Sequence, residues 1–176
     1  MQPRPWTRLG VLAMAGHLGY ELAAGVAVPL ASRVGIRVAA AGYALGAATV
    51  YRAASRSLGP HGDRVSASAN GLFLSAVIAH YTTWPRTRRR GFPWLLESEG
   101  LGPDIIGPYN VLLQVSAVAA VAGLVENRRA WPAAVITVGV ALPVLRSVTP
   151  REYQRLLEQA ATTPRWWNRR LVRRVQ

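Results

Sequence analysis

Five apolar runs separated by clusters of arginine are the feature that most constrains the fold of this chain. Each run is about 18 to 23 residues long, near the roughly 20 residues with which a helix crosses the hydrocarbon core of a bilayer. The arginines lie in the gaps between the runs, which is typical of proteins that cross a membrane several times. The runs are Leu9–Ala31, Val34–Tyr51, Val65–Thr83, Ile105–Val125 and Trp131–Val148.

We therefore predict an all-α integral membrane protein, a polytopic helical bundle with about five transmembrane helices. The second run is the weakest, because it is rich in alanine and has Arg37 near its start. If it forms a buried or interfacial helix instead, the bundle has four spans. Residues 1–148 are predicted to form the bundle, and residues 149–176 a basic amphipathic tail in the cytoplasm.

Arginine counts predict the orientation. In a five-span chain, 14 arginines lie on the side of the C-terminus and 7 on the side of the N-terminus. Positive loops stay on the cytoplasmic side, so the C-terminus is expected there. All 21 basic residues are arginine, and alanine, glycine and valine abound. This composition indicates a GC-rich genome, so the expected location is a bacterial plasma membrane.

Charge and composition exclude several kinds of partner and reaction. A net charge of +13 suggests an anionic membrane or a nucleic acid as partner. The placement of the arginines between apolar runs favours the membrane, and we predict no nucleic-acid partner. The chain has no cysteine, which excludes disulfides, thiolate nucleophiles and cysteine-bound metals. It has no nucleotide-binding or hydrolase motif either, and we predict no cofactor and no metal.

The longest loop, residues 84–104, carries three prolines and several aromatic residues. We predict an interfacial turn of helix on the bilayer surface, with Trp84 and Trp94 as headgroup anchors. A plain connecting loop is the alternative.

The tail has two parts. Arg151–Ala161 is predicted to form a short amphipathic helix, and Arg165–Gln176 interleaves tryptophans with arginines. That second pattern is typical of a segment that binds anionic lipid at a membrane surface. The alternative is a solvated basic tail.

A polar group interrupts the first apolar run. His17, Tyr20 and Glu21 have the spacing i, i+3, i+4, so they project from one face of a helix. Glu21 lies near the midpoint of Leu9–Ala31, where an ionisable side chain costs about 2.5–3.5 kcal/mol. Such a residue indicates a functional site that faces the interior of the bundle.

Partners for Glu21 follow from depth along the helices, at about 1.5 Å per residue. Glu21, His80, Asn110 and Gln114 share one level about 16 to 22 Å from the outer face. Tyr20, Tyr81 and Tyr109 lie close to that level, in the cytoplasmic half of the membrane. His17 and His80 differ in estimated depth by about 10 Å, which argues against a haem held between them. Alternatively, the polar residues form hydrogen bonds that only hold the helices together.

These residues predict an enzyme that acts on a lipid-soluble substrate. A carboxylic acid in an apolar pocket can stay protonated and serve as a general acid, and aromatic faces can stabilise a developing cation. We expect acid-initiated cyclisation or isomerisation of an isoprenoid or terpenoid. The candidate catalytic acids are Glu21 and Asp104. The candidate substrate-binding residues are His17, Tyr20, His80, Tyr81, Trp84, Trp94, Tyr109, Asn110 and Gln114.

The alternative is non-catalytic: a carrier, a lipid-binding protein or an accessory subunit of a membrane complex. A proton-coupled carrier would also need a central glutamate, and a chain of this size would then need to form a homo-oligomer.

Overall fold

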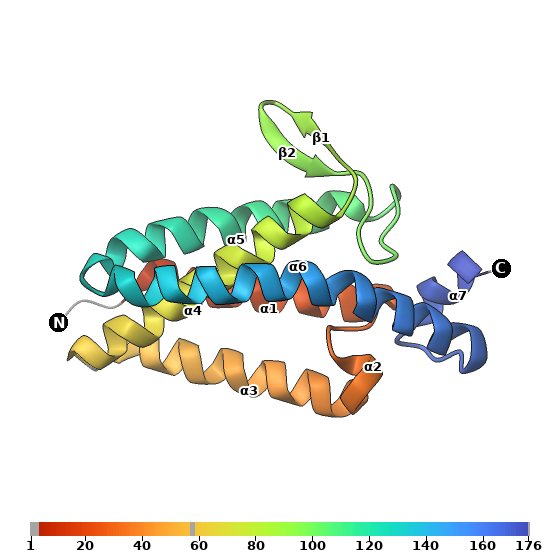
Figure 1. The fold of residues 1–176 in the computed structure, drawn as a ribbon, viewed down its shortest axis with the longest axis horizontal. Helices are drawn as coiled ribbons and strands as arrows, with labels where there is room; N and C mark the ends of the chain where they lie inside the picture. The colour runs from red at the N-terminus through yellow and green to blue at the C-terminus, as the bar shows by residue number, and fades with distance from the viewer. Residues whose placement is uncertain (1–3, 57–58, 176) are drawn as a thin grey trace.

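A computed structural model describes residues 4–56 and 59–175, with side chains through residue 172. Five long helices occupy the five apolar runs, so the all-α prediction is confirmed (Figure 1). The weak second run also lies in a helix, Ile36–Ser55, in which only Ala39 and Ala54 are buried. The long helices are α1 (Pro5–Ala24), α3 (Ile36–Ser55), α4 (Gly59–Thr83), α5 (Ile106–Glu126) and α6 (Trp131–Thr162). The short ones are α2 (Ala31–Val34), η1 (Arg128–Ala130) and α7 (Arg169–Val175).

The first apolar run is not one helix. α1 ends at Ala24, and Gly25 adopts a left-handed conformation with φ of 82°. Glycine takes this conformation without steric cost, and it is the usual residue at such a helix end. The prediction that Leu9–Ala31 is a single span with Glu21 at its midpoint was therefore wrong. Glu21 lies in the last turn of α1 instead.

The long helices alternate in direction, and Arg4 shows which ends meet (Figure 1). The Arg4 guanidinium donates to Asn127 after α5 and forms an ion pair with Asp63 near the start of α4. The Arg4 backbone N–H donates to Ala54 at the end of α3. The beginnings of α1, α4 and α6 therefore gather with the ends of α3 and α5, as the five-run topology requires.

A β-hairpin stands where a turn of interfacial helix was expected in residues 84–104. β1 (Arg86–Arg89) pairs antiparallel with β2 (Phe92–Leu95). Arg90 and Gly91 both have positive φ, which is the backbone of a tight two-residue hairpin turn. The Asn110 side chain binds both the N–H and the carbonyl of Leu95 and so attaches the hairpin to α5. These contacts explain why the helical prediction was wrong.

The C-terminal tail packs on the bundle. α6 continues without a break from residue 131 to residue 162, so the predicted helix Arg151–Ala161 is its last part. After it, Leu171 in α7 is fully buried, and the Arg170 N–H donates to the Gly25 carbonyl. Trp166 stays 61% exposed. The tail residues therefore close one end of the bundle, while Gln176 lies outside the described residues.

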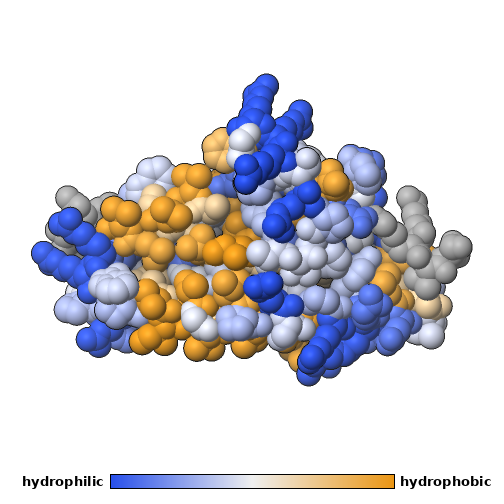
Figure 2. Space-filling view, turned by 45° about the horizontal axis from the view of Figure 1, so that its top comes forward, coloured by the Kyte–Doolittle hydropathy of each residue, from blue (hydrophilic) through white to orange (hydrophobic). Residues whose placement is uncertain are grey.

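Apolar side chains cover much of the outer surface. Figure 2 shows a broad hydrophobic area on the left half of this face, with hydrophilic groups at the left end, on the hairpin and over much of the right half. Within the described residues, two helical stretches are long and apolar enough to cross a membrane, α5 and residues 128–162. Only 6% of the most apolar window in the second stretch is buried within the protein. Val135, Ile136 and Val140 on α6 are each more than half exposed.

Candidate functional site

A cluster of buried polar side chains joins three helices near the end of the bundle that the tail closes. His17 and Glu21 come from α1, His80 from α4 and Tyr109 from α5. Their exposed fractions range from 0% for Glu21 and Tyr109 to 9% for His80. The His17 ring lies edge-on to His80 and to Tyr109, with centroid separations of 5.0 and 4.8 Å. Four of the predicted site residues thus lie together.

The helix register brings the two histidines into contact. The Asn70 amide on α4 donates to the Thr7 hydroxyl on α1 at 2.9 Å, so these residues share one level. His17 and His80 each lie ten residues further along these parallel helices, and ten residues advance both by about 15 Å. The estimated separation in depth of 10 Å was therefore wrong, because it started the two helices level at Leu9 and Val65.

Tyr109 connects the carboxyl group to the first histidine. Its hydroxyl donates to Glu21 Oε1 at 2.7 Å and lies 2.9 Å from His17 Nε2. His17 Nε2 is also 3.1 Å from Glu21 Oε1. Because the phenol has a single proton, the arrangement is consistent when His17 Nε2 carries a hydrogen and donates to this pair of oxygens.

His80 is oriented by its own helix. Its Nδ1 lies 2.8 Å from the Ala76 carbonyl, which can only accept a hydrogen bond. Nδ1 therefore carries the hydrogen, and in neutral His80 the lone pair is on Nε2. Within the described residues, His80 Nε2 and His17 Nδ1 are buried without a hydrogen-bond partner. Two buried ring nitrogens are thus left free to bind something else.

A fifth residue, Glu99, joins the cluster from the loop between β2 and α5. Its carboxyl group is near enough to that of Glu21 for the two to influence each other's charge. Burial, and after it the neighbouring Glu21 charge, raise the pKa of Glu99 to about 8. Glu99 has a φ of 48°, and Gly100 after it is also left-handed. Glu99 is not among the site residues predicted from the sequence, in which the Glu-Ser-Glu-Gly stretch before an apolar run was the available signal.

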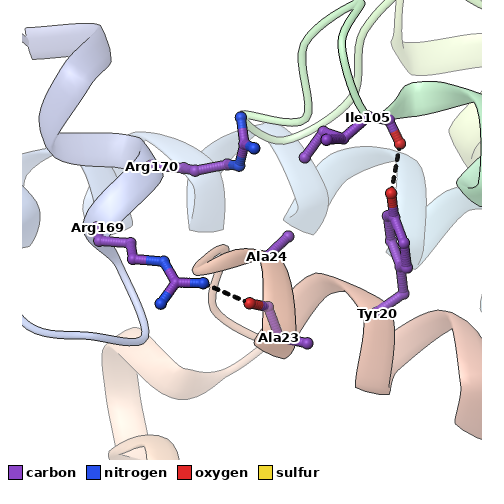
Figure 3. Close-up of a pocket in the computed structure, with 6 residues that line it drawn as sticks. All are labelled: Tyr20, Ala23, Ala24, Ile105, Arg169 and Arg170. Atoms are coloured by element: carbon purple, nitrogen blue, oxygen red, sulfur yellow. Dashed lines mark hydrogen bonds between the residues drawn. The ribbon is translucent and has the colours of Figure 1, made fainter.

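Tyr20 lies between the cluster and a surface pocket. Its ring centroid is 6.3 Å from that of Tyr109, and its hydroxyl donates to the Ile105 carbonyl at 2.6 Å. Figure 3 shows the pocket, about 360 Å³ in volume, whose wall includes Tyr20 and Ile105. Arg169 and Arg170 from the tail form its opposite side, and Arg169 donates to the Ala23 carbonyl.

Two predicted substrate-binding residues instead hold the hairpin. Asn110 binds Leu95, as described above, and the Gln114 amide lies 3.4 Å from the Pro93 carbonyl. Four residues were expected at one depth in the bundle. Of these, Glu21 and His80 lie in the cluster, whereas Asn110 and Gln114 do not. Hydrogen bonding between elements, the alternative interpretation, describes Asn110 and Gln114 better.

The remaining predicted residues lie around the cluster or away from it. Tyr81 is buried in the adjoining apolar core, and the Trp84 ring packs edge-on against Tyr153. Trp94 stacks under the Arg89 guanidinium on the hairpin. The Asp104 side chain is 62% exposed and forms an ion pair with Arg170 at 3.0 Å. The structure thus does not bring Asp104, a candidate catalytic acid, to Glu21.

The donor set of the cluster allows two kinds of chemistry. Carboxyl and phenol groups beside imidazoles can move a proton to or from a bound molecule. One ligand atom each from His17, Glu21 and His80 also lie within 4.8 Å of one another, a grouping that could hold a metal ion. No known family model, curated protein or solved structure matches this chain.

Proposed function

We propose that the chain is an integral membrane protein that crosses the bilayer five times, with its C-terminus in the cytoplasm of a bacterial cell. The alternating helix directions and the exposed apolar side chains of α5 and α6 support this proposal. Each of the five long helices has at least 20 residues, which is about 30 Å of helix. Twice as many arginines lie at the end that holds the cluster, which is then the cytoplasmic end.

The membrane proposal predicts one fractionation result and one result with reporter fusions. The full chain should stay in the membrane pellet after an alkaline carbonate wash and dissolve only in detergent. A fluorescent protein fused after Gln176 should be active, whereas alkaline phosphatase at the same place should not, because phosphatase folds only outside the cytoplasm. Recovery in the carbonate supernatant would contradict the membrane proposal, and an active phosphatase fusion would contradict the orientation.

We further propose that the chain is an enzyme that starts cyclisation or isomerisation of an isoprenoid-like substrate by donating a proton. The observation that carries this proposal is the buried Glu21 carboxyl group, which accepts a hydrogen bond from Tyr109 inside an apolar bundle. A buried carboxyl group is a costly way to join helices, so its presence favours a chemical role. Addition of its proton to a double bond would leave a carbocation and the Glu21 carboxylate. Return of a proton from a neighbouring carbon of the cation to that carboxylate would then give an isomer of the same mass.

The aromatic rings near Glu21 suit that intermediate. The Tyr109 hydroxyl contacts the carboxyl group and the Tyr20 ring centroid lies 6.3 Å from that of Tyr109, and a ring face stabilises a cation within about 6 Å. Ala23, Ala24 and Ile105 give the neighbouring pocket an apolar wall for a hydrocarbon chain. The pocket and the cluster are separated by Tyr20, whose side chain would have to turn to admit the reacting double bond.

Lipid analysis of the purified protein tests the proposed substrate class. We expect mass spectrometry of extracts from detergent-purified protein to find an isoprenoid enriched over the bulk membrane lipids. Incubation with that isoprenoid should then yield an isomer of the same mass. An enriched lipid that is recovered unchanged would support the lipid-binding alternative, and the absence of any enriched isoprenoid would contradict the proposal.

A further inference from the structure

We propose that His17, Glu21 and His80 form a binding site for one divalent first-row transition-metal ion, such as Zn²⁺ or Fe²⁺. The three side chains come from two helices, α1 and α4, and each offers a ligand atom within 4.8 Å of the other two. Two imidazoles and one carboxylate are the donors that these ions prefer, whereas Mg²⁺ and Ca²⁺ favour oxygen alone. This inference goes beyond the proposed function and does not depend on it: a metal-bound Glu21 is ionised, so proton donation by Glu21 belongs to the metal-free protein.

The unused ring nitrogens point to a metal ion more than to a structural role. Buried polar atoms in proteins are nearly always hydrogen-bonded, and an unpaired one costs about 1–3 kcal/mol. His17 and His80 each leave one buried nitrogen without a partner among the described residues. The hydrogen bond from His80 Nδ1 to the Ala76 carbonyl leaves the Nε2 lone pair available. Metal-bound histidines are characteristically held in this way.

Charge balance gives a second, independent argument. Glu21 and Glu99 bring two carboxyl groups together, and in the described part of the chain no arginine forms an ion pair with either of them. This is notable in a chain with 21 arginines. A bound divalent ion would supply beside these carboxyl groups the positive charge that no arginine supplies.

Tyr109 completes the arrangement from α5. Its hydroxyl donates to Glu21 Oε1, so it fixes the orientation of a ligand without being one. Ligand atoms around Zn²⁺ lie about 3.4 Å apart in tetrahedral geometry, since each is about 2.1 Å from the ion. The ligand atoms now lie within 4.8 Å of one another, so the side chains would have to draw together around the ion, and the His17 ring would have to turn to present its unpartnered nitrogen.

Metal titration of the chelator-treated full chain in detergent tests the site. We expect one Zn²⁺ per chain to remain after desalting. When the free Zn²⁺ concentration is 100 times the Kd, the Tm should rise by about 5–10 °C. Mg²⁺ at the same concentration should leave the Tm unchanged. Co²⁺ should give visible absorption bands of a nitrogen- and oxygen-bound ion, which report the site directly. Failure of the wild-type chain to bind either Zn²⁺ or Co²⁺ would overturn the proposal.

Variants identify the ligands. Glu21→Gln and His80→Gln should lose the bound ion, and Tyr109→Phe should bind it about 10–100-fold more weakly. His61→Gln is the matched control, because His61 is an exposed histidine on the same helix as His80, and it should bind like the wild type. Unchanged binding in both Glu21→Gln and His80→Gln, or loss in His61→Gln, would overturn the assignment. Lipid turnover is measured separately, so a failure of the proposed enzyme activity leaves these results readable.

Discussion

Replacement of Glu21 by glutamine should lower turnover of the co-purified lipid by about 10²–10⁴-fold and leave the fold intact. That range is the usual contribution of a general acid, and an amide does not donate a proton at comparable acidity. Glutamine has the size of the acid and keeps an oxygen that can accept the hydrogen bond from Tyr109. The thermal stability is compared in detergent after chelator treatment, so that loss of a bound metal ion does not enter the comparison.

Glu158→Gln is the matched control for this variant, because Glu158 is an exposed glutamate on α6 and should keep full activity. A different result for Glu21→Gln would change the interpretation. If Glu21 is ionised and paired with His17, its removal strands a buried charge and should cost about 3–5 kcal/mol of stability. A stable and fully active variant would exclude Glu21 from the mechanism and remove the main support for an enzyme.

The sequence predicted the helices well because bilayer-length apolar runs and their arginine boundaries are local signals. It failed where a few backbone positions decide the structure. Gly25 ends α1 inside an apolar run that continues to Ala31, so hydropathy alone does not reveal the break. The hairpin at residues 86–95 depends on Asn110. The Asn110 side chain hydrogen-bonds the backbone N–H and carbonyl of Leu95, which have no further strand to pair with. A strand of four residues is too short to show a periodic pattern from which such a contact could be predicted.

The candidate site was predictable in part for the same reason. The spacing of His17 and Glu21 places both on one helix face, and that follows from sequence alone. Contact with His80 depends on how α1 and α4 are shifted along each other, which is decided by Thr7 and Asn70 at the far end of the bundle. Glu99 lies in a loop whose path depends on residues with positive φ. An estimate of depth along a helix therefore could not predict its position.

Replacement of Gly71 by leucine should cause a large loss of stability, because the backbones of α4 and α6 approach closely there. A Cβ atom at Gly71 would lie 2.8 Å from the Ala134 carbonyl oxygen and 3.2 Å from its Cα. Both are backbone atoms, so no side-chain rotation relieves the contact and the helices must separate. α4 and α6 share the most extensive helix–helix interface in the described chain, and small residues permit such close approach.

One added methyl group in a tight interface costs about 1–3 kcal/mol, so Gly71→Ala should lower the Tm in detergent by roughly 2–12 °C. Gly71→Leu should exceed that loss or prevent recovery of folded protein. Gly139→Leu on α6 is the matched control, because a Cβ atom there meets nothing within 4 Å. Ala134→Gly should not rescue Gly71→Ala, since the clash is with the backbone. Rescue by Ala134→Gly, or equal Tm values for Gly71→Leu and Gly139→Leu, would show that α4 and α6 do not pack at Gly71.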